Sequence, residues 1–440
     1  MSLMERVQKS HDVRQLKTLQ ASADRLEDLK QELYCRFSSD EIARLVVDSP
    51  LRARNEIKSV CTGIFEGNAW SNVLPHEREQ LIERLIDTVF GLGPLEALLN
   101  DTEITEIMVN GAEAVFYEKE GKLYSHDRVF ATDDQVRALI DRIIGPLGRR
   151  IDESSPMVNA RLKEGHRVNA IIPPLALDGP TLTIRKFRER LYTLEEMEQL
   201  GSLSAPMRQF LRWSVLARKN IAVSGGTGSG KTTLLNALSC VIPKTERIVT
   251  IEDSAELKFM YHPHVVRLES RPRNAEGLGE VTIRDLVINA LRMRPDRIIV
   301  GECRGAEAFD MLQAMNTGHD GSLTTLHANS STDAITRLSA MVRYAADLPI
   351  SVIEAQIASA IDLVVQTARA TDGLRYIQEM MVLGQNAQGE SEPLLLYQRS
   401  SRDGQEKWMM PQQCLDEFCA KGVADREEVA SWFQFISSEA

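Results

Sequence analysis

Residues 225–232 of the chain read Gly225-Gly226-Thr227-Gly228-Ser229-Gly230-Lys231-Thr232. The pattern G-x-x-x-x-G-K-S/T, placed between the strand-like run 221–223 and the helix-like run 234–238, predicts a P-loop. Its glycines let backbone N–H groups face a phosphate, Lys231 reaches the β- and γ-phosphates, and Thr232 ligates Mg²⁺. We therefore expect residues 225–233, Thr233 included, to bind a nucleotide with Mg²⁺. A merely Gly-rich turn is the alternative.

The sequence around this motif alternates between helix-like and strand-like segments from residue 205 to about 370. Short apolar runs at residues 221–223, 248–251 and 298–300 have the length of buried strands. Such alternation is typical of an α/β fold with a largely parallel sheet. The sequence therefore predicts an α/β P-loop domain over residues 201–370.

Two acidic residues follow apolar strands of this segment. Glu302 comes after the run 298–300, and Glu252 comes after 248–251. Because Mg²⁺ needs only a carboxylate or two, Glu302 could hold a metal-bound water or orient the attacking water, and Glu252 could polarise water. The alternatives are a solvated strand-end charge for Glu302 and an N-cap or exposed pair for Glu252. Which of the two is the general base stays open.

Histidines and arginines complete the candidate site. His327 sits at a strand end among small polar residues and suits a hydrogen bond to a γ-phosphate, whereas a structural role is the alternative for His319. Guanidinium groups can stabilise charge on a transferring phosphoryl group. Arg167 and Arg185 are the candidates for this task. A structural salt bridge explains any one basic residue of the group equally well; the others are Lys186, Arg188, Arg292, Arg294, Arg297 and Arg304.

The remaining segments of the chain differ in the secondary structure that their residue patterns predict. Residues 1–100 are expected to be helical, and residues 101–187 carry the short β-type runs and turn signals of a small α+β domain. Residues 188–200 are expected to be a charged connector. Residues 371–440 form a tail with strand-like pieces at 379–383 and 393–397 and no recognisable chemistry.

Composition narrows the class of protein. With 43% apolar and 26% charged residues, the chain has the balance of an ordinary globular protein. A net charge of −11 argues against a dedicated nucleic-acid binder. The start lacks an apolar signal segment, and no stretch is long and apolar enough to span a membrane, so we expect a cytoplasmic protein. The six scattered cysteines suggest reduced thiols and neither a disulfide framework nor a zinc ribbon.

These motifs, in the order P-loop, Glu252, Glu302 and His327, resemble the type II/type IV secretion ATPase superfamily, and most closely its CpaF-like branch, which serves Tad (Flp) pili. Specific strings carry the resemblance, and they lie at residues 90–96, 104–111, 167–175, 182–187, 281–286 and 312–322. Cys303, Ala306 and Asn159 depart mildly from the pattern of that branch, and none of them removes a phosphate ligand.

The resemblance implies a hexameric ATPase ring at the cytoplasmic side of the inner membrane. In each subunit a PAS-like N-terminal domain would close on ATP held by a RecA-like domain, with Arg167 and Arg185 reaching the γ-phosphate. The motion would drive an inner-membrane platform protein that inserts or withdraws pilin subunits, so membrane association would come through partners alone.

Other readings compete with this one. A GTPase-type switch would need an N-K-x-D motif, which the sequence lacks. A RecA-like motor that translocates nucleic acid is disfavoured by the acidic balance, and no nucleic-acid partner is expected. A scaffold that binds ATP without turnover is disfavoured by the presence of Lys231, Thr232, Glu252 and Glu302.

Overall fold

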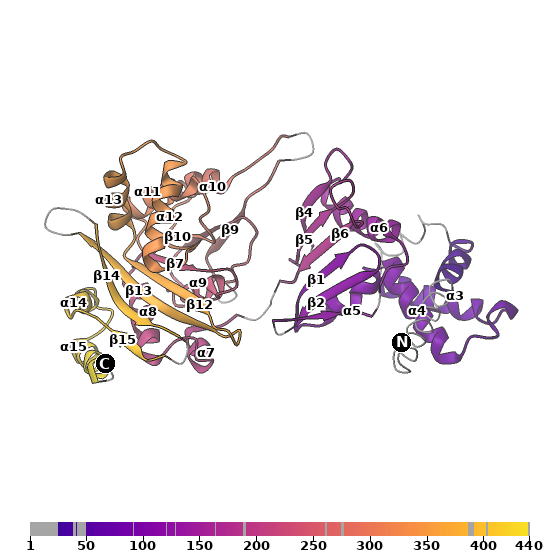
Figure 1. The fold of residues 1–440 in the computed structure, drawn as a ribbon, viewed down its shortest axis with the longest axis horizontal. Coiled ribbons are helices and arrows are strands. Elements are labelled where there is room, and N and C mark those ends of the chain that lie inside the picture. The colour runs from indigo at the N-terminus through magenta and orange to yellow at the C-terminus, as the bar shows by residue number, and fades with distance from the viewer. Residues whose placement is uncertain are drawn as a thin grey trace, which may run out of the picture. The chain divides into compact units, whose positions relative to one another are not determined.

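The computed structural model describes residues 25–37, 41, 50–90, 92–119, 121–127, 129–162, 164–187, 191–259, 262–273, 277–385, 391–401 and 404–438. The chain forms two compact units, Met1–Arg188 and Glu189–Ala440, and most of their elements are labelled in Figure 1. The first 24 residues of the expected helical segment and residues 188–190 of the expected connector lie outside the described residues. The finer division at residues 100, 187, 200 and 370 stays a prediction.

The first unit starts with helices that pack on one another. α3 (Pro50–Ile64) and α4 (Pro75–Phe90), with the 3₁₀ turn η1 (Asn68–Trp70) between them, bury a shared set of apolar side chains that includes Ile57, Ile64 and Leu85. The turn η2 (Gly93–Leu95) and the short helix α5 (Glu96–Asn100) then lead into a sheet.

An antiparallel sheet makes up the rest of the first unit. Its six strands lie in the order β3-β2-β1-β6-β5-β4. Their bounds are β1 (Ile104–Asn110), β2 (Ala114–Lys119), β3 (Lys122–Ser125), β4 (Met157–Arg161), β5 (Arg167–Ile171) and β6 (Thr181–Arg185). One face packs against α6 (Asp133–Ile144), which ends in the turn η3 (Gly145–Leu147), so alternate residues such as Val168 and Ile184 are buried.

The second unit is built on a nine-stranded sheet in the order β15-β14-β13-β12-β7-β11-β10-β8-β9. The pairs from β12 to β9 are parallel, and those from β12 to β15 are antiparallel. The strands are β7 (Ile221–Gly225), β8 (Ile248–Glu252), β9 (Val265–Glu269), β10 (Arg297–Val300), β11 (Leu323–His327), β12 (Leu363–Arg369), β13 (Arg375–Gln385), β14 (Ser391–Arg399) and β15 (Glu406–Trp408). The expected α/β class with a largely parallel sheet is confirmed.

Helices cover both faces of this sheet. One core joins it to α7 (Leu194–Gln199), α8 (Ala205–Leu216), α9 (Lys231–Ser239), α14 (Gln413–Ala420) and α15 (Arg426–Ser438). The other core joins it to α10 (Ile283–Ala290), α11 (Glu307–Asn316), α12 (Ser331–Arg343) and α13 (Ile350–Ala360). Burial from both sides explains why β7, β8 and β10 are buried at every residue and are mostly apolar.

The segment after residue 370 continues the same sheet. β13 and β14 include the strand-like pieces expected at 379–383 and 393–397. α14 and α15 then cover α8 with an aromatic cluster in which Phe418 and Trp432 contact Phe210 and Trp213. No helix among the described residues has both the length and the apolar character to cross a membrane.

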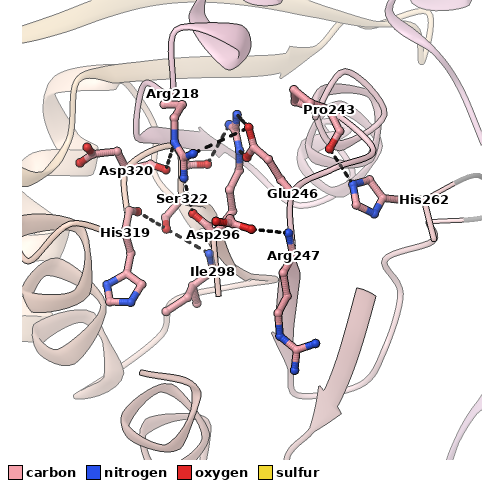
Figure 2. A network of polar contacts seen from close by, with 12 residues as sticks. Arg218, Pro243, Glu246, Arg247, His262, Asp296, Ile298, His319, Asp320 and Ser322 are labelled. Atoms are coloured by element: carbon pink, nitrogen blue, oxygen red, sulfur yellow. Dashed lines mark hydrogen bonds and ion pairs between the residues drawn. The ribbon is translucent and has the colours of Figure 1, made fainter. Parts of the chain in front are cut away.

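A polar network ties together the amino ends of the parallel strands (Figure 2). Arg297, the first residue of β10, is 0% exposed and pairs with Glu246 at 2.5 Å. It also donates a hydrogen bond to the carbonyl oxygen of Gly321, just before β11, at 3.2 Å. Arg218, just before β7, donates to the carbonyl oxygen of Asp296. Arg297 is therefore a structural residue, as the salt-bridge alternative proposed.

Arg297→Ala should destabilise the protein strongly, because the carboxylate of Glu246, only 15% exposed, would lose its main partner. We expect a loss of about 3–5 kcal/mol in the free energy of unfolding, measured by urea denaturation of the full chain. The exposed Arg292 supplies the matched control, since Arg292→Ala should cost less than about 0.5 kcal/mol. Equal effects of the two substitutions would contradict the structural role of Arg297.

Candidate active site

The P-loop lies at the carboxyl end of β7 and runs into α9, as its spacing predicts. Gly228 has a φ of 71° and Gly230 a φ of 96°, which glycine adopts without strain. At Gly225 a Cβ atom would come within 2.5 Å of Ser229 Oγ, so only glycine fits there. The loop thus needs its glycines both for conformation and for space.

Lys231, the first residue of α9, is 8% exposed and turned back onto the loop. Its Nζ donates hydrogen bonds to the carbonyl oxygens of Gly225 at 3.0 Å and Gly226 at 2.9 Å, and lies 3.4 Å from His327 Nδ1. Burial lowers the pKa of Lys231, Glu302 opposes the shift, and Arg304 adds to it. The ammonium group is therefore held at the mouth of the loop by partners that a phosphate can replace.

Glu302 and His327 face each other across neighbouring strand ends. Glu302 follows β10 and His327 ends β11, and the Glu302 Oε1 atom lies 3.1 Å from His327 Nε2. This contact lacks the alignment of a hydrogen bond, and within the described part of the chain the buried Oε1 has no hydrogen-bond partner. The other oxygen, Oε2, accepts a hydrogen bond from Arg304 Nη2 at 2.6 Å. Glu302 therefore keeps one buried oxygen for a further donor or cation.

The histidine is held in its neutral form at neutral pH. Burial lowers the pKa of His327, and Lys231 lowers it further, while Glu302 works in the opposite direction. A neutral imidazole has one donor and one acceptor nitrogen. With Lys231 near Nδ1, the ring can accept from the ammonium, and its Nε2 atom lies beside the carboxylate of Glu302. His327 thus connects the P-loop lysine to Glu302.

Glu252 is buried at the end of β8, and it is 3% exposed. Its Oε2 accepts hydrogen bonds from the backbone N–H groups of Glu256 at 2.7 Å and Leu257 at 2.9 Å. Its Oε1 is buried and has no hydrogen-bond partner among the described residues. Burial raises the pKa of Glu252 to about 7, against the lowering effect of those N–H groups. Neither alternative describes Glu252, because residues 256–257 lie in a loop without helical structure and the side chain is buried. One oxygen binds the backbone of that loop, while the other stays available.

Side chains from β12 join the separate strand ends. Gln366 Oε1 accepts from Ser224 Oγ at 2.5 Å, and its Nε2 donates to the carbonyl oxygen of Ala328 at 3.2 Å. Thr367 Oγ1 lies 2.8 Å from Ser229 Oγ. A pocket of about 270 Å³ lies beside the loop and is lined by Gly226, Thr227, Ser229, Ala328, Asn329, 366–369 and Gln378. β12 therefore links the P-loop to the residues after His327.

Residues 89–407 match the family model described as Type II/IV secretion system protein. The chain belongs to this family. It is 38% identical over 313 residues to a protein of Mycobacterium tuberculosis whose name assigns it provisionally to conjugal transfer, and the match covers 70% of this chain and 88% of that one. The Type IV secretion system protein PtlH of Bordetella pertussis is 37% identical over 311 residues, which cover 65% of this chain and 92% of PtlH.

The solved structures extend this likeness to the fold. The crystal structure of the pilus retraction motor PilT with bound ADP matches with a TM-score of 0.50 at 20% identity, over 67% of this chain and 83% of that one. At this level of identity the match concerns the fold alone. Family membership brings nucleotide binding with it, in agreement with the P-loop.

The residues predicted for the site of this secretion-system protein fall into two groups, those that lie beside the P-loop and those that lie elsewhere. Lys231, Glu302 and His327 lie together at one edge of the sheet, with Arg304 paired to Glu302. His319 lies before the amino end of β11, and its Nδ1 lies 3.2 Å from the carbonyl oxygen of Ala314, as a structural histidine would. The structural reading is therefore correct for His319.

The arginines predicted as a phosphate clamp lie in the first unit of this secretion-system protein. Arg167 on β5 and Arg185 on β6 are direct cross-strand partners, on the sheet face opposite the buried Val168 and Ile184. Arg161 on β4 pairs with Arg167 in turn, so three arginines lie in one row. Sequence reasoning missed Arg161, which the alternation of buried and exposed residues in β4 could have placed on this face. Lys186 instead donates to the carbonyl oxygens of Leu98, Leu99 and Asp101.

The side chains at the site suit a metal ion that takes only one or two ligands from the protein. Among the described residues, no three His, Cys, Asp or Glu side chains come together. Mg²⁺ does not require such a group, because it keeps several waters and takes one or two carboxylates together with substrate phosphates. The buried, unbonded Oε1 of Glu302 suits this role, with Thr232 in the first turn of α9 as the hydroxyl donor.

The buried carboxyl of Glu252 should make stability depend on pH. Its pKa is raised from 4.5 to about 7, so between these values the folded state keeps a proton that the unfolded state releases. The free energy of unfolding should therefore fall as the pH rises from about 4.5 to 7, by roughly 3 kcal/mol in total.

Glu252→Gln cannot ionise and should remove this part of the slope, as measured by urea denaturation between pH 5 and 8 without nucleotide. Glu354→Gln changes an exposed glutamate on α13 and should leave the slope unchanged. A Glu252→Gln protein with the slope of the unsubstituted chain would show that Glu252 is ionised in the folded protein throughout this range.

Proposed function

We propose that this chain is one subunit of a hexameric ring motor that converts ATP hydrolysis into movement of a secretion or pilus machine. That the chain is an ATPase follows from its membership of the Type II/IV secretion system protein family. The observation that carries the proposal is the convergence of Lys231, Glu302 and His327 at the carboxyl ends of adjacent parallel strands. ATP is the substrate, and Mg²⁺ is the cofactor.

The residues divide the chemistry among them. Backbone N–H groups of residues 225–233 and Lys231 bind the phosphates, and Thr232 and Glu302 hold Mg²⁺. When bound, Mg²⁺ neutralises charge that develops on the phosphate oxygens. Glu252 or Glu302 accepts a proton from the attacking water, and the buried, unbonded oxygen of each supports this role. His327 reports the γ-phosphate, because it lies between Lys231 and Glu302.

The wider assignment rests on family resemblance. The second unit corresponds to a RecA-like ATPase domain with the tail 371–440 appended, and residues 101–187 of the first unit to a PAS-like domain, joined by the connector 188–200. The machine is of the Tad pilus type, as in the CpaF-like branch. The ring works in the cytoplasm against an inner-membrane platform protein, through which alone it associates with the membrane.

Lys231→Ala should abolish ATP hydrolysis and leave the fold intact, because it removes a charge from the phosphate site. The expected result is a loss of turnover of at least about a hundredfold in a steady-state phosphate-release assay, with an unchanged thermal unfolding midpoint. Lys244 is an exposed lysine of the same unit, so Lys244→Ala serves as the control and should keep full activity. Normal turnover by purified Lys231→Ala protein would refute the P-loop assignment.

The phosphate clamp is the second part of the proposal. Arg167 and Arg185 bind the γ-phosphate of the ATP held by their own chain, as the family resemblance implies. Release of these guanidinium groups on hydrolysis would couple the chemistry to domain motion.

Mixed rings of Lys231→Ala and Arg185→Ala subunits, each inactive alone, test which chain the arginine serves. If Arg185 acts within its own chain, no site in any mixture has both an intact P-loop and an intact clamp, so ATPase activity should stay at background. Subunit exchange is verified separately with labelled chains. Recovery of activity well above background would show that the arginine acts across the subunit interface.

A further inference from the structure

The β12–β13 hairpin brings two arginines to the outer side of the P-loop. Arg369 ends β12 and Arg375 begins β13, and the two are direct cross-strand partners. The turn between them is closed by the N–H of Gly373, which donates to the carbonyl oxygen of Ala370, and by the N–H of Leu374, which donates to Asp372 Oδ1. The hairpin is thus a compact, internally bonded arm beside the loop.

Arg375 contacts the backbone of the loop directly. Its Nε donates a hydrogen bond to the carbonyl oxygen of Gly228 at 2.9 Å. Its aliphatic part lies against Gly230, where a Cβ atom would come within 3.0 Å of Arg375 Cδ. A Cβ atom on Gly228 would likewise lie 3.6 Å from Arg369 Nη1. Both guanidinium groups are therefore close to the apex of the loop.

The hydrogen bond to Gly228 bears on phosphate binding through the geometry of the peptide unit. In a planar trans peptide the C=O of one residue and the N–H of the next point in opposite directions. With the carbonyl of Gly228 turned to Arg375, the N–H of Ser229 points the opposite way, into the loop, where it donates to the carbonyl oxygen of Gly226 at 3.4 Å. Arg375 thus fixes the orientation of an amide donor whose long bond within the loop an anion can replace.

The positive charge of Arg369 and Arg375 also favours an anion near the loop. Like charges directly opposite each other on antiparallel strands destabilise a sheet, so Arg369 beside Arg375 has a cost. A bound anion nearby would offset that cost. The pocket of about 270 Å³ includes Arg369 in its lining, together with Gly226, Thr227 and Ser229 of the loop.

We propose that Arg375 is a positioning residue for the phosphate-binding loop, which it serves by holding the Gly228–Ser229 peptide, and that Arg369 adds positive charge at the same place. The inference rests on the proposed function and deepens it, because the chemical class recognised is the polyphosphate of the nucleotide. The arginines belong to the same unit as the P-loop, so they act independently of the clamp in the first unit.

Inorganic pyrophosphate is the probe, because it reports on the phosphate site without a base or sugar. Its dissociation constant is measured by displacement of a fluorescent ADP analogue from the full chain. Arg375→Gln should weaken pyrophosphate and ADP binding by a similar factor of about ten, as expected for loss of a charge-assisted hydrogen bond. Arg375→Lys, which keeps the charge and a donor, should stay within about threefold of the unsubstituted protein.

Two further variants make the outcome decisive. Arg343→Gln, at an exposed arginine in the last turn of α12, is the matched control and should bind normally. Lys231→Ala should lose pyrophosphate binding. If it does and Arg375→Gln binds within twofold of the unsubstituted chain, the role of Arg375 is refuted and the proposed function stands. If Lys231→Ala also binds normally, the proposed function fails. An equal loss by Arg375→Gln and Arg375→Lys would refute positioning by charge and donor.

Discussion

The parallel ladder from β7 through β11 and β10 to β8 is the constraint on which the site depends. In this ladder His327 lies opposite Gly225, Val300 opposite Thr324, and Val300 also opposite Ile251. Parallel strands end at the same edge, so residues far apart in the sequence leave the sheet side by side. Lys231, His327 and Glu302 are neighbours because of this register, and a slip of one strand by a single residue would separate them.

The electrostatic state of the site follows from that crowding. A lysine, an arginine, a carboxylate and a neutral imidazole share a small, half-buried volume, so the neighbouring charges act on the pKa values of Lys231 and His327. The ammonium of Lys231 binds the carbonyl oxygens of its own loop, and any phosphate it receives must replace them. Binding is therefore an exchange of partners, with little new exposure of charge to water.

The sequence predicted those parts of the site that local spacing controls. The P-loop depends on glycines and a lysine at set intervals, Glu302 follows a run apolar enough to be a buried strand, and His327 lies at the end of a strand-like run of small polar residues. Local spacing could not distinguish the role of Arg297 from that of Arg304. Arg297 lies at the amino ends of the parallel strands and pairs with Glu246, whereas Arg304 lies beyond their carboxyl ends and pairs with Glu302. Gln366 and Arg375 were missed for a different reason: they reach the loop only because β12 pairs with β7, some 140 positions earlier in the chain.

The position of the P-loop strand within the sheet affects where changes in sequence and length can be accommodated. β7 has β12 on one side and β11 on the other, and the margins of the sheet are β15 and β9. The interior strands have paired neighbours on both sides and helices on both faces, whereas within the described part of the chain each marginal strand pairs on one side only. Changes in length and sequence can therefore accumulate at β9 and β15 with the least disturbance to the chemistry. Related proteins can therefore differ most at β9 and β15, where added segments would disturb the ATPase site least.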